Sequence, residues 1–225
     1  MKYLLLVPCL LLACTSFIYA GDDPAGETPK KEEPKAEEKK EEPKVVEEAP
    51  EFATIDKKAP DFTLKNAKGE DVKLSSFADK IIVLQWNNYD CPYVKKHYEG
   101  GNMTGLEKKY REKGVVWLQI CSSAPGKEGH FTGDALTERI KKEGDDAAFY
   151  LIDEEGNVGR KYKARCTPHM FVIDKKGVLR YQGAIDSNKS AKKEDIEGAT
   201  NYVSAALDEL LGDKEVSTKE TKPYG

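Results

Sequence analysis

One cysteine lies where the sequence leads us to expect chemistry, just beyond an apolar strand. Residues 81–86 contain five large apolar side chains in six positions, which predicts a strand that is covered on both faces of a sheet. Cys91 follows Trp86 by five residues, and Pro92 suits the first turn of a helix. Reacting groups in α/β proteins gather beyond the carboxyl ends of such strands. A thiol at the positive end of a helix is favoured as the thiolate, the form that attacks disulfides and peroxides.

The alternative is that Cys91 fills space in the core, as free cysteines commonly do. The polar segment 87–90 argues against this alternative, because it offers a packing cysteine few apolar neighbours. Neighbouring charges act in opposite directions: the carboxylate of Asp90 disfavours the thiolate, whereas Lys95, one helical turn further on, favours it. We therefore interpret Cys91 as a reactive cysteine.

A second cysteine, Cys121, follows the next buried strand, which is predicted at residues 115–120. Because a helix separates this strand from residues 81–86, the two strands should be parallel with a right-handed crossover. Cys121 would then reach the same edge of the sheet as Cys91. The remaining predicted elements are strands at 61–64, 71–74, 149–152, 170–173 and 178–181, and helices at 92–98, 104–113, 134–143, 157–163 and 194–211.

Two local signals refine the helices. Gly100 and Gly101 should interrupt the helix that Pro92 opens. Thr104 and Glu107 have the spacing of a capping box, which predicts that the next helix begins there.

The third cysteine, Cys166, opens the run Cys166-Thr167-Pro168-His169, directly before a predicted strand. Proline is tolerated at such a place because it need not donate to the sheet, and a cis X-Pro bond commonly marks a functional turn. An ordinary trans proline in a loop is the alternative.

The first twenty residues have the pattern of a secretory signal. Lys2 precedes an uncharged run over 3–20 with an apolar centre at 4–13, and Ala20 is the expected cleavage point. This pattern predicts export to the periplasm or cell envelope. Residues 11–14 are also similar to a lipoprotein cleavage box, so a lipid anchor at Cys14, tethering the N-terminus to a membrane, is one alternative. A retained membrane anchor is the other, although the run is only marginally long enough.

Residues 21–57 are predicted to be a disordered linker. The part from 21 to 50 contains eleven acids, six lysines and five prolines and no aromatic residue, so it cannot bury enough surface to offset its ordering entropy. The whole chain carries a net charge of −4, residues 21–50 contribute −5 and Lys2 contributes +1, so residues 51–225 are neutral. A neutral domain gives no reason to expect a nucleic-acid partner.

The number of cysteines in the mature domain is odd. Cys9 and Cys14 belong to the targeting segment, which leaves Cys91, Cys121 and Cys166. In an oxidising compartment at least one thiol is then free, catalytic or paired with another molecule.

The order of elements around these motifs resembles the thioredoxin-like superfamily. The closest resemblance is to its redoxin branch, which includes the alkyl hydroperoxide reductase and thiol-specific antioxidant (AhpC/TSA) group and the TlpA-like envelope proteins. Besides Cys91-Pro92 and Thr167-Pro168, residues 59–64 (APDFTL) and 168–174 (PHMFVID) carry the likeness, which spans about 59–211. It implies an α/β fold with a central mixed sheet flanked by helices, an N-terminal β-hairpin and an inserted strand-helix segment. The domain would span 58–211, followed by a flexible tail over 212–225.

The resemblance also implies how the site is built. Thr167 and cis-Pro168 would face the sulfur of Cys91, and the exposed backbone of Thr167 would pair with an extended peptide or a thiol substrate. Pro92 and His169 would complete the substrate-binding rim. Proteins of this kind often continue to another cysteine beyond Pro-Tyr-Gly. This sequence stops at Gly225, so we expect no redox role for its tail.

The sequence departs from its relatives at several positions. Thioredoxins carry a second cysteine three residues after the first, but Val94 stands there, so a two-thiol cycle within one turn is impossible. Leu84 and Asn88 replace the proline and threonine of peroxiredoxins, and Pro168 replaces their later arginine. The last departure weakens the case for peroxide chemistry, which needs donors that polarise the O–O bond.

Several partners for Cys91 remain open. Cys166 and Cys121 are both candidate resolving cysteines, because either could come within disulfide distance at this edge of the sheet. A Cys121 to Cys166 pair or a lone Cys91 thiol are the other arrangements.

Cys91, His97, Cys166 and His169 form at most a weak metal-ligand set, because no close ligand pair is present, so we predict no metal and no cofactor. We interpret His97 as a solvated residue and His169 as a rim residue that tunes the thiolate.

The leading hypothesis is an exported redoxin-type thiol-disulfide oxidoreductase that acts on protein or small-molecule thiols and disulfides. Cys91 would form a mixed disulfide that Cys166, Cys121 or an outside thiol releases. A thiol peroxidase, in which peroxide oxidises Cys91 to a sulfenic acid, is the second hypothesis. The third is a non-enzymatic thioredoxin-like binding module.

Overall fold

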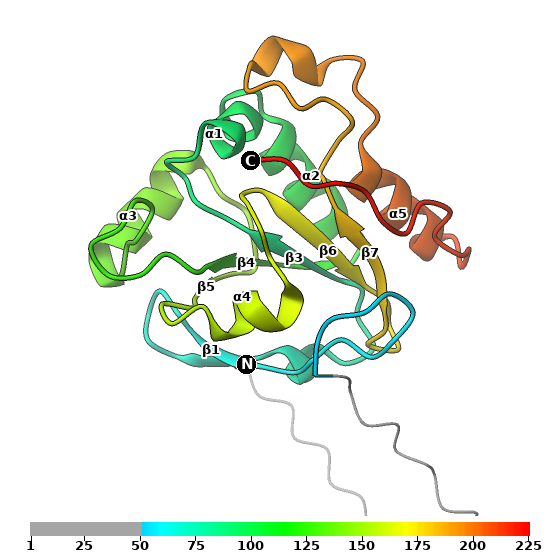
Figure 1. The fold of residues 1–225 in the computed structure, drawn as a ribbon, viewed down its shortest axis with the longest axis horizontal. Helices are drawn as coiled ribbons and strands as arrows, with labels where there is room; N and C mark the ends of the chain where they lie inside the picture. The colour runs from blue at the N-terminus through cyan, green and yellow to red at the C-terminus, as the bar shows by residue number, and fades with distance from the viewer. Residues whose placement is uncertain (1–50) are drawn as a thin grey trace, which may run out of the picture. The chain divides into compact units, whose positions relative to one another are not determined.

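The strand predicted at residues 81–86 lies inside a seven-stranded mixed sheet (Figure 1). The computed structural model describes residues 51–225. The strands are β1 (Thr63–Asn66), β2 (Asp71–Lys73), β3 (Ile82–Trp86), β4 (Val116–Cys121), β5 (Phe149–Ile152), β6 (His169–Ile173) and β7 (Leu179–Gly183). Their order across the sheet is β2-β1-β5-β4-β3-β6-β7.

Helices cover both faces of this sheet. They are α1 (Pro92–Glu99), α2 (Asn102–Arg111), α3 (Gly133–Glu143), α4 (Asn157–Tyr162) and α5 (Tyr202–Leu211), with short 3-10 turns η1 (Leu74–Phe77) and η2 (Lys193–Ile196). The predicted break at Gly100 and Gly101 is present between α1 and α2. Within the described residues, no helix has the length and apolar character needed to cross a bilayer.

The pairing of the strands brings three chain segments to one edge. β3 is parallel to β4, as predicted, and Trp86 pairs with Ile120, so that Cys121 lies one residue beyond. β6 runs antiparallel to β3 on the other side, and its first residue, His169, also pairs with Trp86. The end of β3, the end of β4 and the start of β6 therefore meet where Cys91 follows.

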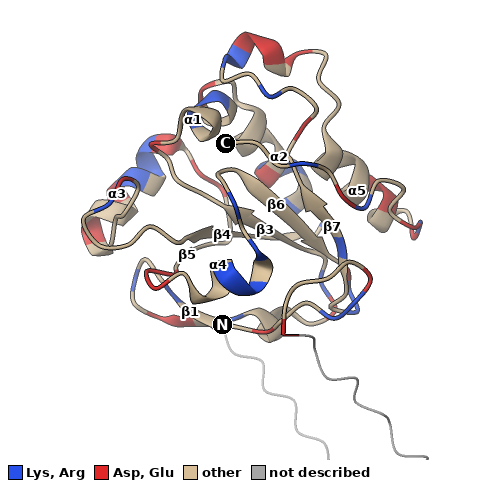
Figure 2. Cartoon of the chain, in the orientation of Figure 1, with Lys and Arg blue, Asp and Glu red and all other residues tan. Residues whose placement is uncertain are grey.

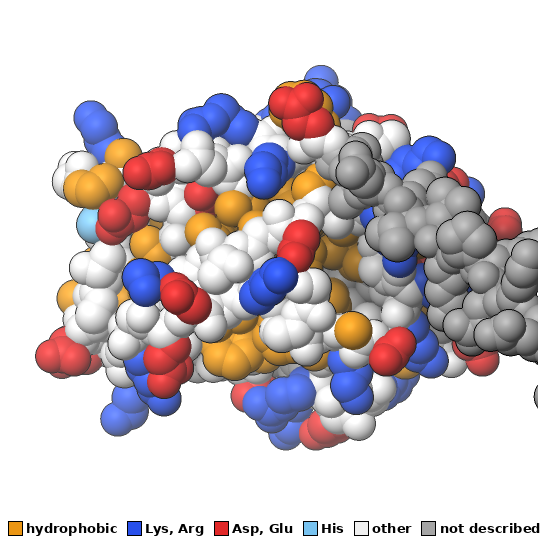
Figure 3. Space-filling view, turned by 90° about the horizontal axis from the view of Figure 1, so that it is seen from below, with side chains coloured by type: hydrophobic (Ala, Val, Ile, Leu, Met, Phe, Trp, Pro, Cys, Tyr) orange, Lys and Arg blue, Asp and Glu red, His pale blue; other side chains and the backbone are white. Residues whose placement is uncertain are grey.

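Alternate residues of the central strands feed two separate cores. Val83 and Trp117 point to the face covered by α1, α2, α3 and α5. Leu84 and Trp86 point to the opposite face, where α4 and the β1–β2 hairpin pack. Seen from below in Figure 3, the molecule shows apolar side chains in hollows between charged ones. This two-sided burial explains the continuous apolar run of β3.

Two predicted helices begin later or earlier than the sequence indicates. The helix predicted at 194–211 is divided, because Gly198 has a φ of 80° after η2, and α5 starts only after Asn201, whose side chain accepts a hydrogen bond from Ser204 N. The predicted capping box is wrong: α2 is capped by Gly101, and Glu107 is fully buried instead.

The predicted boundaries of the domain need correction at its N-terminal side. Residues 51–57, which the composition assigns to the linker, pack on the domain, because Ala53 is buried and Asp56 forms ion pairs with Arg180 and Lys219. The predicted signal peptide at 1–20, the lipid-anchor cysteine Cys14 and the linker up to residue 50 lie outside the described residues.

The predicted flexible tail over 212–225 contains no helix or strand, but it is packed. Gln182 N in β7 donates to Lys219 O at 3.0 Å, and Thr221 N donates back to Gln182 O at 3.1 Å. β7 is an edge strand with unpaired backbone groups, and the tail satisfies some of them. Val216 and Tyr224 anchor the segment as buried apolar side chains in a polar stretch.

Candidate redox site

Cys91 is the N-cap residue of α1, as the sequence predicts. Its carbonyl oxygen accepts hydrogen bonds from Val94 N at 3.0 Å and Lys95 N at 2.9 Å, and Pro92 is exposed in the first helical turn. The side chain therefore lies at the positive end of the helix dipole. It is only 8% exposed, so that a substrate has limited access to the sulfur.

The loop before Cys91 is more buried, and has more apolar neighbours, than its polar sequence predicts. Asn87 and Tyr89 are both buried, and Cys91 belongs to the same core cluster as Tyr89 and Tyr98. The buried polar atoms are paired, because Asn87 Nδ2 donates to Gln119 Oε1 at 2.5 Å. The prediction that a packing cysteine would find few apolar neighbours here is thus wrong.

The segment before β6 faces this sulfur. Cys91 Sγ donates to Thr167 O at 3.1 Å, and the Thr167–Pro168 peptide bond is cis. The predicted juxtaposition of Cys91 with this turn is therefore confirmed. The role of Thr167 and Pro168 in holding a substrate stays a prediction.

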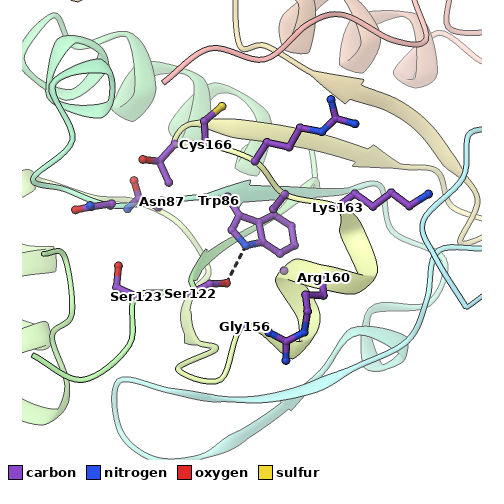
Figure 4. Close-up of a pocket in the computed structure, with 13 residues that line it drawn as sticks. Trp86, Asn87, Ser122, Ser123, Gly156, Arg160, Lys163 and Cys166 are labelled. Atoms are coloured by element: carbon purple, nitrogen blue, oxygen red, sulfur yellow. Dashed lines mark hydrogen bonds between the residues drawn. The ribbon is translucent and has the colours of Figure 1, made fainter. Parts of the chain in front are cut away.

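Cys166 lies directly before this turn and is half-buried. Burial raises the pKa of the Cys166 thiol, negative charge on Cys91 raises it further, and Arg165 acts in the opposite direction. Burial and a charged Cys91 therefore both favour the protonated form of the Cys166 thiol. A cavity of about 590 Å³ is lined by Cys166 and Thr167 on one side and by Trp86 and Ser122 on the other (Figure 4).

Cys121 has different neighbours, although it reaches the same edge of the sheet. Its Sγ donates to Gly129 O at 3.4 Å, and the side chain is 5% exposed. It does not line the cavity that contains Cys166. Cys166, by contrast, directly precedes Thr167, whose carbonyl contacts Cys91 Sγ, and charge on Cys91 acts on its thiol.

The negative charge next to Cys91 is compensated. Asp90 Oδ1 accepts a hydrogen bond from Arg139 Nη1 at 2.9 Å, and Arg139 Nη2 donates to Tyr89 O at 3.1 Å. The guanidinium also pairs with Glu143 at 2.8 Å, and it is only 16% exposed. Arg139, on the distant α3, thus offsets a carboxylate that would otherwise disfavour the Cys91 thiolate.

Replacing Arg139 with glutamine is therefore expected to slow alkylation of Cys91 by about three- to tenfold near neutral pH, since the uncompensated Asp90 lowers the thiolate fraction. Iodoacetamide labelling followed by mass spectrometry of the Cys91 peptide measures this rate. The double variant with Asp90→Asn should recover the wild-type rate. A slow double variant would mean that Arg139 acts by packing instead of by charge.

The end of the tail lies against the same turn. A Cβ atom added to Gly225 would come within 2.8 Å of Thr167 N and 2.9 Å of Cys166 Cβ, which shows how closely the two backbones approach. The Thr167 backbone, predicted to be exposed for a substrate, is thus contacted by the protein's own chain. A peptide strand could pair there only if this segment moved.

Tyr224 holds the tail through a buried cluster of polar side chains. Its hydroxyl donates to Asp186, and its ring lies 5.8 Å from that of Tyr93. Lys96 Nζ lies 3.8 Å from Asp186 Oδ2 and donates to Asn188 O at 2.9 Å. Both charged side chains are almost completely buried.

His97 belongs to this cluster and is fully buried, so the prediction of a solvated residue is wrong. Its Nδ1 and Nε2 atoms lie 2.8 Å from Asn102 Nδ2 and 3.3 Å from Tyr224 Oη. Burial lowers the pKa of His97 to about 4, although Asp186 opposes this shift. The neutral ring therefore serves as a hydrogen-bonding partner of the tail.

His169, predicted to line the substrate site, begins β6 and is 5% exposed. Its ring lies 4.4 Å from that of Phe171, and burial together with the charge of Arg165 lowers its pKa to about 4. Among the described residues, no three His, Cys, Asp or Glu side chains are grouped so as to hold a metal ion.

A second buried polar cluster lies behind the strand that precedes Cys91. Glu107 accepts hydrogen bonds from Tyr98 Oη at 3.1 Å and from Gln119 Nε2 at 3.0 Å. Gln119 Nε2 also donates to Asp145 at 2.5 Å, so that one amide bridges two carboxyl groups. Burial and the charge of Asp145 raise the pKa of Glu107 to about 9.

This cluster predicts that stability falls as the pH rises from about 4.5 to about 9. Between the ordinary pKa of 4.5 and about 9, folded Glu107 holds a proton that the unfolded chain has lost, so stability falls as the pH rises. The slope should approach about 1.4 kcal/mol per pH unit. Urea denaturation from pH 5 to 9 should show that the free energy of unfolding falls less steeply with pH in Glu107→Gln. The slope should be unchanged in Glu112→Gln, which alters an exposed carboxylate. An unaltered slope in Glu107→Gln would contradict the assignment.

The sheet order, the cysteine at a helix N-terminus and the facing cis-proline together define a thioredoxin-like fold. The chain belongs to the AhpC/TSA family, whose sequence model matches residues 55–182. The predicted redoxin family and thioredoxin-like fold are confirmed, and with them the class of oxidoreductases.

Similar proteins include both peroxidases and thiol-disulfide oxidoreductases by name. One, "Probable phospholipid hydroperoxide glutathione peroxidase" of Nicotiana tabacum, is 26% identical over 156 residues, covering 53% of this chain and 91% of that protein. The thiol-disulfide oxidoreductase ResA of Bacillus thuringiensis subsp. konkukian is 28% identical over 124 residues, covering 55% of this chain and 65% of that protein.

A solved structure with the same architecture covers more of the chain. An uncharacterized conserved protein from Geobacillus kaustophilus aligns with a TM-score of 0.63 and 26% identity, covering 76% of this chain and 88% of that chain.

Proposed function

We propose that this protein is an exported thiol-disulfide oxidoreductase in which Cys91 is the nucleophile and Cys166 the resolving thiol. The observation that carries the proposal is the 3.1 Å contact from Cys91 Sγ, at the N-terminus of α1, to the carbonyl of Thr167, the residue after Cys166. The name of the ResA relative supports it. Export to the periplasm or cell envelope rests on the sequence pattern of residues 1–20 alone.

The reaction proceeds in two exchange steps. The Cys91 thiolate attacks a substrate disulfide, forming a Cys91–substrate bond and releasing one substrate thiolate. Cys166, after losing its proton, then attacks the Cys91 sulfur, which forms the Cys91–Cys166 disulfide and releases the second substrate thiolate. The substrate gains two electrons and the protein loses two, so an outside thiol must reduce the protein again.

The charges around the site support this division of roles. Cys91 lies at the positive end of a helix, and Arg139 compensates Asp90 beside it. Cys166 is held as a thiol by burial and by the charge on Cys91, and Arg165 eases its later ionisation. The attack on substrate removes the Cys91 charge, so Cys166 can ionise more easily at the stage when it must react.

The test is to trap the intermediate. A Cys166→Ser variant incubated with a disulfide substrate should accumulate a mixed disulfide at Cys91, seen as a mass increase equal to one substrate thiol. The wild type should pass through this species quickly and end with an internal disulfide. If Cys121→Ser accumulates the adduct and Cys166→Ser does not, Cys121 is the resolving residue and the proposal is wrong on that point.

Peroxide reduction is the second candidate function, and the name of the tobacco relative favours it. Cys91 would be oxidised by a peroxide to a sulfenic acid, releasing water or an alcohol, and Cys166 would condense with it to the same disulfide. Adding hydrogen peroxide or an organic hydroperoxide to the reduced protein separates the two activities. Peroxide consumption faster than disulfide exchange would make the peroxidase the main activity.

A further inference from the structure

The charged side chains that line the cavity beside Cys166 are all positive. Arg160, Lys163 and Arg165 line it, and no carboxylate does. Figure 2 shows this basic character on α4 and on the chain just after it, and Figure 4 shows Arg160 near the indole of Trp86, with the side chain of Lys163 extending away from the ring. The volume of about 590 Å³ is within the range of small-molecule sites.

The nearest buried carboxylate does not neutralise these cations. Asp153, beneath the cavity, accepts hydrogen bonds from Ser122 Oγ at 2.7 Å and from Gly159 N at 2.9 Å. Arg160 is fixed by Glu155 O at 2.9 Å and by Asn157 Oδ1, which are uncharged partners. Arg165 forms no ion pair with any residue from 51 to 225. Lys163 Nζ lies 5.1 Å from the centroid of the Phe52 ring, an uncharged partner. Within residues 51–225, none of the three cations is therefore neutralised by a carboxylate.

The floor of the cavity is partly apolar. The indole N–H of Trp86 donates to Ser122 Oγ at 3.0 Å, so that its polar atom is already satisfied. The ring can then contact carbon or sulfur atoms of a ligand. Thr167, whose carbonyl contacts Cys91 Sγ, lies on the wall next to Cys166. The cavity thus brings three cations and Cys166 together, whereas Cys91 does not line it and contacts the carbonyl of Thr167 in its wall.

We infer that this cavity binds the carboxylate-bearing part of a low-molecular-weight thiol or disulfide, which reacts with Cys91. The inference rests on the proposed function and names its substrate class. A peptide strand fits less well, because Gly225 lies against the Thr167 backbone that such a strand would need. A small disulfide approaching from the cavity side needs no backbone pairing.

The experiment compares three small disulfides of similar size and different charge. These are 3,3′-dithiodipropionate (dianion), 2-hydroxyethyl disulfide (neutral) and cystamine (dication). The rate constant of the reduced full-length protein with each is divided by that of dithiothreitol, which removes differences in intrinsic reactivity. At low ionic strength the normalised rate of the dianion should exceed that of the dication by at least about tenfold, and salt should reduce the difference.

Matched variants locate the effect. Lys163→Gln/Arg165→Gln removes two cavity cations, and Lys161→Gln/Lys142→Gln removes two exposed lysines outside the cavity. The first variant should lose at least about fivefold of the dianion preference and the second should keep it, with the neutral disulfide reacting alike in both.

The outcomes separate the inference from the proposed function. Equal normalised rates for all three disulfides, or an equal loss in both variants, would overturn the inference and leave the oxidoreductase intact. A disulfide-linked acidic peptide that reacts much faster than the dianion would also overturn it, in favour of a macromolecular substrate. No reaction with any disulfide would remove the proposed function itself.

Discussion

Replacing Cys91 with serine is expected to abolish thiol-disulfide exchange, lowering the rate at least about 10³-fold, because a serine hydroxyl is not ionised near neutral pH and forms no disulfide. The side chain has almost the same size, and Cys91 contributes no side-chain cap to α1, so the fold should be retained. Consumption of 2-hydroxyethyl disulfide by the reduced protein measures the loss.

Two further single variants serve as controls. Cys121→Ser should retain activity within about twofold, since Cys121 lies outside the cavity and its sulfur binds the Gly129 carbonyl. Cys166→Ser should keep the first exchange step and lose the release step. A Cys91→Ser protein with more than a tenth of the wild-type rate would show that another thiol performs the attack.

The second large effect concerns the buried charges that hold α1 and the tail together. Asp186→Asn is expected to lower the free energy of unfolding by about 3 kcal/mol, because it leaves the Lys96 ammonium buried without a counter-charge. The hydrogen bond from Lys96 to Asn188 O remains and limits the loss. Urea denaturation of the full-length protein measures the change.

A double-mutant cycle tests the origin of this loss. Lys96→Met should also destabilise the protein, because it leaves the Asp186 charge buried, and the double variant should recover at least about 2 kcal/mol relative to the sum of the single effects. Additive losses would contradict a charge pair and would indicate that each residue contributes by packing.

Asp186→Asn should also speed alkylation of Cys91, since Tyr224 loses its carboxylate partner and the tail covers the site less tightly.

Much of the site could be predicted because its signals are local. The apolar run of β3, Pro92 at the start of α1 and Pro168 before β6 each follow from short-range rules on sheets, helices and proline. The parallel pairing of β3 with β4 then follows from the helix between them. These steps are sufficient to bring Cys91 and Cys121 to one edge, whereas the resemblance to the redoxin branch was needed to place the Thr167–Pro168 turn opposite Cys91.

The parts that sequence analysis missed depend on contacts between distant residues. Lys96 is buried because Asp186, ninety residues further along, and Asn188 satisfy its ammonium, and no local pattern encodes such pairing. His97 carried a weak signal, since it shares a helix face with Val94, but its neighbouring lysines suggested solvent. The packed tail has a polar composition, and only Val216 and Tyr224 within it are anchors.

The environments of Glu107 and Asp90 also depend on residues that are distant in the sequence, so sequence analysis missed them. Glu107 has the spacing of a capping residue, but Gln119 and Tyr98 offer it hydrogen bonds inside the core. Arg139 could not be connected with Asp90 from the sequence, because forty-nine residues separate them and only the packing of α3 beside the loop joins them.

The most direct test of this account is peptide mapping of the full-length protein after oxidation by one equivalent of a small disulfide. The account predicts that the peptides containing Cys91 and Cys166 are joined by a disulfide bond and that Cys121 stays free and open to alkylation after unfolding. A bond between Cys121 and Cys166, with Cys91 left as an unreacted thiol, would contradict it.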